Sequence, residues 1–185
     1  QMSLEIIIGP MFSGKTTELL RRLTGYNAIS KKCIYVNSSL DTREETNFST
    51  HNPLIKDLNI DSIKIDKINY DFIKQVRGYD VIGIDESQLF NGTLEVCIRT
   101  LVDDMNKIVI VSGLNGDYKR SKFGKILDLI PHCDSIIKLY PYCKTCSESG
   151  KVTKALFSKR VCEGGDVIDI SYTNYIPVCR LCYNN

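Results

Sequence analysis

One segment near the start of the chain constrains the fold most, because it combines a strand, a glycine loop and a helix. The apolar run from Leu4 to Ile8 leads into the sequence GPMFSGKT, and good helix formers with apolar residues at 19, 20 and 23 come next. This pattern is typical of a P-loop, which binds the phosphates of a nucleotide. Its residues are Gly9, Pro10, Met11, Phe12, Ser13, Gly14, Lys15 and Thr16.

The residue types of this loop explain what it can bind. Its two glycines allow a tight turn whose backbone N–H groups face a phosphate chain, at a helix N-terminus whose dipole favours anions. Lys15 would reach the β- and γ-phosphates, and the Thr16 hydroxyl would bind Mg²⁺. The alternative is an ordinary glycine turn between a strand and a helix.

The first 140 residues alternate short β-branched runs with helical or polar segments, which is typical of a mainly parallel sheet covered by helices. We therefore expect an α/β fold of the P-loop, RecA-like type over residues 1–141. A long loop is predicted over the polar segment 37–52. Strands are predicted at 4–8, 33–37, 80–85, 107–112 and 135–139, and helices at 16–28, 93–104 and 124–130.

Composition and charge limit the classes of protein that the chain can belong to. The 185 residues are 43% apolar and 25% charged, as expected for one full globular core. A net charge of +2 gives no large basic field, so no nucleic-acid partner is expected. No apolar run has the length of a membrane span, and the first residues lack the layout of a signal peptide. We expect a cytoplasmic protein without a membrane partner, with Gln1 a tag remnant before a native start at Met2.

Four of the eight cysteines form two CxxC pairs in the last quarter of the chain. Each CxxC turn directs two sulfurs toward one point, so the pairs predict a tetrahedral, structural Zn²⁺ site. Redox-active CxxC pairs and structural disulfides are the alternatives. The sequence around the pairs is not thioredoxin-like, which disfavours redox pairs, and nothing in the chain directs secretion, which disfavours disulfides. A segment as short as 142–185 could hardly hold a core unaided, so we expect a small zinc domain there. The predicted ligands are Cys143, Cys146, Cys179 and Cys182.

A second chemical signal is the apolar strand from Val81 to Ile84, which ends in adjacent carboxylates at Asp85 and Glu86. In sheets of this type, ligands gather at the C-terminal ends of the strands. Asp85 is predicted to hold Mg²⁺, and Glu86 is free to act as a general base. Two solvated acids in a turn are the alternative.

These motifs occur in an order that resembles the type II thymidine kinase family. The resemblance covers nearly the whole chain. It is carried by GPMFSGKT with Glu18–Leu19, Asp41–Arg43, Thr50–His51, Asp85–Gln88, Gly113–Tyr118, Phe123–Gly124, and Tyr175 before Cys179–Tyr183. The family transfers the γ-phosphoryl group of ATP to the 5′-hydroxyl of thymidine. The resemblance therefore implies thymidine and ATP as partners, ATP with Mg²⁺ and structural Zn²⁺ as cofactors, feedback inhibition by dTTP, and a homotetramer.

The resemblance also implies roles for residues at matching positions. Glu86 would be the base, and the lasso loop between the cysteine pairs would close over the nucleoside base. ATP and Mg²⁺ would be bound by the P-loop with Asp41, Thr42, Arg43, Asp85, Ser87 and Gln88. The nucleoside would contact Met11, Gln88, Leu114, Tyr118, Phe123, Thr153 and Tyr175, and the lasso residues Asp166, Val167, Ile168, Asp169 and Ile170.

The chain departs from the usual pattern of the family at a few positions. It has Leu89 where an aromatic residue is usual, Asn115 in place of Asp, and Tyr118 in place of Phe. The lasso is longer than usual and has Ile170–Ser171 where the family has two glycines.

Two other classes of function are alternatives to a kinase. One is a P-loop ATPase that acts on nucleic acid through a zinc ribbon, which the nearly balanced charge opposes. The other is a regulatory nucleotide-binding module without catalysis, which the position of Glu86 opposes.

Overall fold

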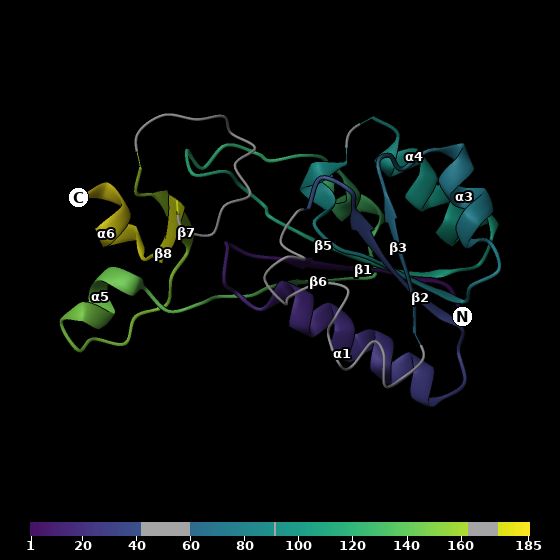
Figure 1. Cartoon of the computed structure of the whole chain (residues 1–185), viewed down its shortest axis with the longest axis horizontal. Coiled ribbons are helices and arrows are strands. Elements are labelled where there is room, and N and C mark those ends of the chain that lie inside the picture. Colours follow the sequence, from purple (N-terminus) through teal and green to yellow (C-terminus); the bar gives the residue numbers. More distant parts are fainter. Residues whose placement is uncertain (42–59, 91, 163–173) are drawn as a thin grey trace.

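The computed structural model describes residues 1–41, 60–90, 92–162 and 174–185. A six-stranded sheet with helices on both faces forms the larger part (Figure 1). Its elements are β1 (Ser3–Ile8), α1 (Lys15–Ala28), β2 (Cys33–Ser38), β3 (Asp61–Ile65), α3 (Tyr70–Val76), β4 (Val81–Ile84), α4 (Leu94–Arg99), β5 (Ile108–Gly113) and β6 (Ser135–Lys138). Shorter turns are the 3₁₀ helices η2 (Ser87–Leu89) and η4 (Ile126–His132) and the π-helix η3 (Thr100–Asp104).

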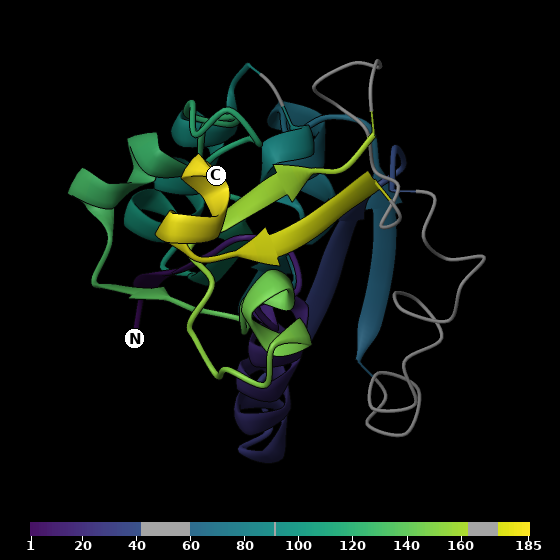
Figure 2. The ribbon, with the colours of Figure 1, turned by 90° about the vertical axis from the view of Figure 1, so that its left-hand side faces the viewer.

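The described residues from Tyr142 onward form what we call the cysteine module, at one end of the molecule. It contains α5 (Lys144–Glu148), β7 (Phe157–Arg160), β8 (Tyr175–Val178) and α6 (Arg180–Asn184). β7 and β8 pair in an antiparallel ribbon, and this ribbon lies in front of the large sheet when the molecule is viewed from that end (Figure 2).

All strand pairs of the large sheet are parallel, in the order β3-β2-β4-β5-β1-β6. Only β5 separates β1, which leads into the P-loop, from β4, which leads into Asp85 and Glu86. Because the C-terminal ends of parallel strands share one edge, the P-loop, the two carboxylates and the segment after β5 meet there. The sheet order thus assembles the candidate site.

Alternation of side chains along the strands produces two separate cores. On one face α1 packs Leu19, Leu20 and Leu23 against Ile7 and Tyr35. On the other face α3 and α4 cover a larger apolar cluster (Figure 1). The odd-numbered residues of β4, Val81 and Gly83, point toward the face of the sheet that α1 covers. Asp85 continues this alternation and lies on the same face, where it accepts from Thr16.

The predicted α/β fold is confirmed, as are the five predicted strands and the helix over 16–28. The helix expected over 93–104 divides into α4 and the π-helix η3. The helix expected over 124–130 is instead the 3₁₀ helix η4, which contains Pro131, a residue without an N–H donor. β3 and α3 were not predicted. β3 is a partly exposed edge strand with alternating polar residues, and α3 has only seven residues, so neither has a strong apolar period.

Gly83 sets how closely α1 approaches the sheet. An added Cβ there would lie 2.8 Å from Cδ1 of Leu23 and 3.0 Å from Cδ1 of Leu19. We expect Gly83→Ala to lower the free energy of unfolding by about 1–3 kcal/mol, because the core is overpacked. Urea denaturation measures the change. Gly25→Ala, within α1 and with nothing near the added methyl group, should instead raise stability by about 0.5–1 kcal/mol; equal effects at both sites would contradict this account.

Candidate active site and four-cysteine cluster

The P-loop forms between β1 and α1, as the sequence predicts. Gly9 has a φ of 155°, and an added Cβ would lie 2.6 Å from the carbonyl oxygen of Leu139, so a side chain does not fit. Gly14 caps the N-terminus of α1 in a left-handed conformation. Lys15 is buried, and its ammonium donates to the carbonyl oxygen of Pro10 at 2.8 Å. The loop therefore places a cation beside the positive end of a helix, which favours a phosphate ligand.

Asp85 is 1% exposed, and its carboxylate accepts four hydrogen bonds. Oδ2 accepts from the hydroxyls of Thr16 and Tyr35, both at 2.7 Å. Oδ1 accepts from the Ser112 hydroxyl at 2.6 Å and from the backbone N–H of Glu86 at 2.9 Å. The hydroxyl of Thr16 and the carboxylate of Asp85 are the oxygen ligands that Mg²⁺ prefers, so this pair fits the predicted metal.

Tyr35 reaches Asp85 from inside the core. Its side chain is 1% exposed, and burial raises the pKa of Tyr35 well above its usual range, with the negative charge of Asp85 adding to the shift. The phenol therefore stays protonated at neutral pH and remains a donor. As a result β2, which contributes no P-loop residue, helps to fix the carboxylate.

Glu86 and Gln88 link the end of β4 to the segment after β5. Glu86 has φ 49° and ψ 43°, a left-handed conformation at the start of η2. Gln88 donates from Nε2 to Oε2 of Glu86, and its Oε1 accepts from the backbone N–H of Leu114 at 3.1 Å. All of these side chains are largely buried. The candidate base is thus oriented by an amide whose other end is held by the main chain.

An aromatic pocket lies between the P-loop, the segment after β5, and the β7–β8 ribbon. The rings of Tyr118 and Tyr175 lie 6.2 Å apart at 45° and form one wall. The hydroxyl of Ser158 accepts from the backbone N–H of Met11 at 3.2 Å, so β7 is tied to the P-loop. The pocket is lined by Met11, Leu114, Gly116, Asp117, Tyr118, Phe123, Ser158 and Tyr175.

Some predicted residues lie elsewhere or outside the described residues. Asp41 is buried near the same edge of the sheet, where its carboxylate accepts from Nδ2 of Asn37 at 2.9 Å. Thr153 does not line the pocket, and its carbonyl accepts from the backbone N–H of Cys143. Thr42, Arg43 and the lasso residues Asp166 to Ile170 lie outside the described residues.

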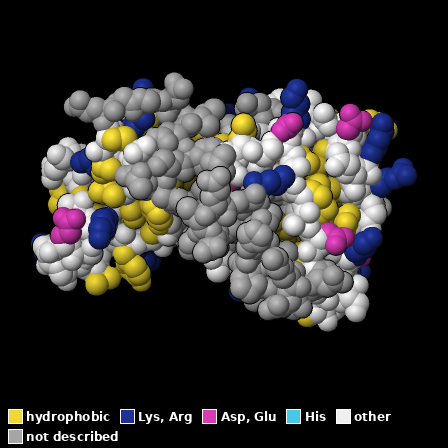
Figure 3. Space-filling model, viewed as in Figure 1, with side chains coloured by type: hydrophobic (Ala, Val, Ile, Leu, Met, Phe, Trp, Pro, Cys, Tyr) yellow, Lys and Arg dark blue, Asp and Glu magenta, His cyan; other side chains and the backbone are white. Residues whose placement is uncertain are grey.

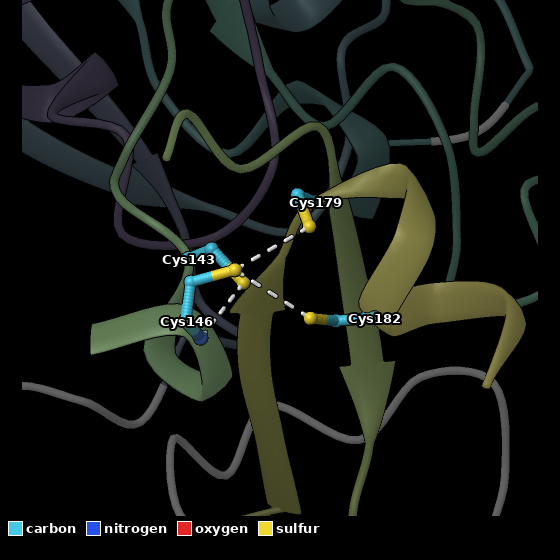
Figure 4. A group of neighbouring side chains, drawn as sticks. All are labelled: Cys143, Cys146, Cys179 and Cys182. Atoms are coloured by element: carbon cyan, nitrogen blue, oxygen red, sulfur yellow. Dashed lines mark hydrogen bonds between the residues drawn. The ribbon is translucent and has the colours of Figure 1, made fainter. Parts of the chain in front are cut away.

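The four predicted cysteines converge, with their sulfurs all within 4.8 Å of one another (Figure 4). The sulfur of Cys146 lies 3.8 Å from that of Cys179 and 3.7 Å from that of Cys182. Four sulfurs at about 2.3 Å from a tetrahedral zinc ion would be about 3.8 Å apart, whereas a disulfide requires about 2.05 Å. The cluster therefore fits Zn²⁺, and these four thiols form no disulfides.

The thiols of the cluster differ in how readily they ionise. Burial opposes ionisation of Cys143, but hydrogen bonds from the backbone N–H groups of Cys146 and Cys179 outweigh it and lower the pKa of Cys143 to about 7. Hydrogen bonding with Cys179, followed by burial, raises the pKa of Cys182 to about 12. Four thiolates this close together would need a cation, and Zn²⁺ would supply one.

Comparison with known proteins agrees with this geometry. The family model described as thymidine kinase matches residues 2–183. The chain belongs to the thymidine kinase family. It is 41% identical to a thymidine kinase of Choristoneura biennis entomopoxvirus, over 99% of this chain and 97% of that protein. It is 39% identical to one of Amsacta moorei entomopoxvirus (100% and 99%) and 37% identical to one of Dictyostelium discoideum (98% and 78%).

Several residues of the site in this thymidine kinase family member were missed by sequence reasoning. Ser112 carries a detectable signal, because it is a polar residue in the otherwise apolar strand β5. Gly116 and Asp117 lie inside a motif that was recognised, but no role was assigned to them. Tyr35 and Ser158 carry no signal, since each fits an ordinary strand position.

The hydrogen bond from Tyr35 to Asp85 should contribute to stability because the carboxylate is buried. We expect Tyr35→Phe to lower the free energy of unfolding by about 1–3 kcal/mol, since a buried acceptor loses a donor. Tyr79→Phe is the matched control, because its hydroxyl donates to Asp61 at an exposed site. That variant should change stability by less than about 0.5 kcal/mol. Urea denaturation compares the two, and equal losses would contradict the assigned role of burial.

Proposed function

We propose that the protein transfers the γ-phosphoryl group of ATP to the 5′-hydroxyl of thymidine, giving dTMP and ADP. The observation that carries this proposal is the hydrogen-bonded series Glu86–Gln88–Leu114, which joins a carboxylate beside the P-loop to the aromatic pocket. Phosphoryl transfer needs little covalent chemistry from the protein and depends on positioning and charge stabilisation. A base between a phosphate site and an aromatic site for the nucleoside would meet that requirement.

The P-loop end of the site is suited to ATP. In the proposal, the backbone N–H groups from Gly9 to Thr16 and the Lys15 ammonium bind the phosphates, and Thr16 and Asp85 hold Mg²⁺. Mg²⁺, when bound, neutralises charge on the β- and γ-phosphates. Other residues remain predicted to bind ATP or Mg²⁺. They are Asp41, Thr42 and Arg43, and Ser87 and Gln88, which follow Glu86 in the chain.

Glu86 is proposed as the base for the acceptor alcohol. Its carboxylate takes the proton of the 5′-hydroxyl as the new O–P bond forms and the bond from the γ-phosphorus to the β-phosphate oxygen breaks. Gln88 would orient this carboxylate through its hydrogen bond to Oε2. The left-handed backbone at Glu86 allows this carboxylate to diverge from Asp85.

The nucleoside end is proposed to be the pocket of Met11, Leu114, Tyr118, Phe123 and Tyr175. Aromatic rings provide flat faces for a pyrimidine, and Met11 belongs to both the P-loop and the pocket. Thr153 and the lasso contacts from Asp166 to Ile170 remain predictions.

The wider organisation also forms part of the proposal. A Zn²⁺ ion in the four-cysteine cluster would hold both ends of the lasso, with residues 142–185 acting as a domain that covers the nucleoside. Feedback inhibition by dTTP and a homotetramer are expected from the resemblance, and a cytoplasmic location is expected from the sequence. None of the described helices combines the length and apolarity that a bilayer crossing demands. On the face seen in Figure 3, lysine and arginine side chains lie among fewer aspartate and glutamate side chains. A nucleic-acid partner is not part of the proposal.

A panel of acceptors tests the proposal directly. The protein is incubated with ATP, Mg²⁺ and each common deoxynucleoside, and products are separated by chromatography. We expect a monophosphate from thymidine and release of ADP in equal amount. Phosphate release that needs DNA and gives no nucleoside product would instead support a motor ATPase.

Glu86→Gln tests the base. We expect the kcat to fall by about 10²–10⁴, because the amide keeps the shape of the side chain but cannot accept the proton. Binding of ATP and thymidine, measured by calorimetry, should stay within a few-fold of the unchanged protein. Glu95→Gln, at an exposed ion pair with Arg99, is the control and should keep full activity. Wild-type turnover by Glu86→Gln would refute the assignment.

A further inference from the structure

Tyr183 connects the cysteine module to the aromatic pocket, although it belongs neither to the predicted ligands nor to the residues that line the pocket. It follows Cys182 directly on α6. Its backbone N–H donates to the carbonyl oxygen of Cys179 at 2.9 Å, so its position depends on the turn that joins these two cysteines. Its hydroxyl donates to the carbonyl oxygen of Tyr118 at 2.7 Å, across 65 residues of sequence.

The ring of Tyr183 packs against an aromatic and a cationic neighbour. The ring of Phe157, on β7, lies 5.2 Å from it at 56°, and the guanidinium carbon of Arg120 lies 4.3 Å from its centre. Lys159 adds a bond from its ammonium to the carbonyl oxygen of Cys182 at 2.9 Å. A half-buried ring with an aromatic and a cationic neighbour has few alternative rotamers, so the direction of its hydroxyl is well defined.

The segment that receives this hydrogen bond is a compact turn. The carboxylate of Asp117 accepts from the backbone N–H groups of Lys119 and Ser121 at 2.8 and 2.9 Å. Gly116 and Lys122 close the turn as an antiparallel bridge. Because the turn is fixed internally, a contact at the Tyr118 carbonyl sets the position of the whole turn, including the Tyr118 ring in the wall of the pocket.

We propose that Tyr183 is a positioning residue for the nucleoside pocket. The four-cysteine site fixes the start of α6, and the Tyr183 hydroxyl then fixes the Tyr118 turn against Tyr175. The module would thus shape the pocket through a route separate from the lasso. This inference rests on the proposed function, because it takes the pocket as the thymidine site.

The test compares Tyr183→Phe with Tyr142→Phe in the full-length, zinc-loaded protein. Tyr142 is 66% exposed and directly precedes Cys143, so the control removes a hydroxyl from the same module away from the pocket. We expect Tyr183→Phe to raise the Kd for thymidine, measured by calorimetry, and its KM by about tenfold, the usual effect of one lost hydrogen bond. The kcat at saturating thymidine, the KM for ATP and the zinc content per chain should not change, and Tyr142→Phe should match the unchanged protein.

Three results would overturn the proposal. They are an unaltered thymidine Kd in Tyr183→Phe, an equal rise in the KM for ATP, and loss of zinc from the variant. The last two would mean that Tyr183 supports the fold in general. Thymidine binding by the unchanged protein separates this inference from the proposed function. If the unchanged protein does not bind thymidine, the proposed function itself is rejected. If it binds thymidine and Tyr183→Phe has no effect on the Kd, only this inference is rejected.

Discussion

The buried carboxylate of Asp85 holds the candidate active site together. An unpaired charge in a protein interior costs several kcal/mol, so a carboxylate at this depth must be matched by donors. Here the donors come from the first turn of α1, from β2, from β5 and from the backbone after β4. Thr16 and Tyr35 share one oxygen. A shift of α1 over the sheet would therefore break the hydrogen bond from Thr16 to Asp85, so this carboxylate links the proposed phosphate site to the sheet.

The second half of the site is organised differently. The aromatic pocket draws on the P-loop, the turn after β5, and the β7–β8 ribbon of the cysteine module, which are distant in sequence. Among the described residues no core cluster spans all three, and they are joined by contacts such as that of Ser158 with Met11. The P-loop end of the site is thus built on the central sheet. The aromatic pocket depends instead on where the cysteine module, with its four clustered thiols, is placed.

Sequence reasoning succeeded where local chemistry restricts the choice of residue. The glycines of the P-loop, the apolar strands and the paired cysteines each have a pattern that few other structures use, and the structure places them as expected. It failed where a residue acts through a long-range partner. Nothing in the run Cys33–Val36 shows that Tyr35 donates a hydrogen bond to Asp85 and is more than an ordinary core tyrosine. Likewise, nothing in the sequence marks Tyr183 as a hydrogen-bond donor to Tyr118. β3 and α3 were missed because their few residues have a weak apolar period, and tertiary pairing with β2 determines the strand.

The hydrogen bonds of Gln88 have a fixed direction, which follows from the main chain. A backbone amide can only donate, so the Leu114 N–H requires the oxygen of Gln88, and the nitrogen must then face Glu86. The orientation of the carboxylate is therefore independent of which side chain occupies position 114. The side chain at position 114 can therefore be exchanged during evolution without disturbing the proposed base, so the shape of the pocket at this position and the orientation of Glu86 can change separately.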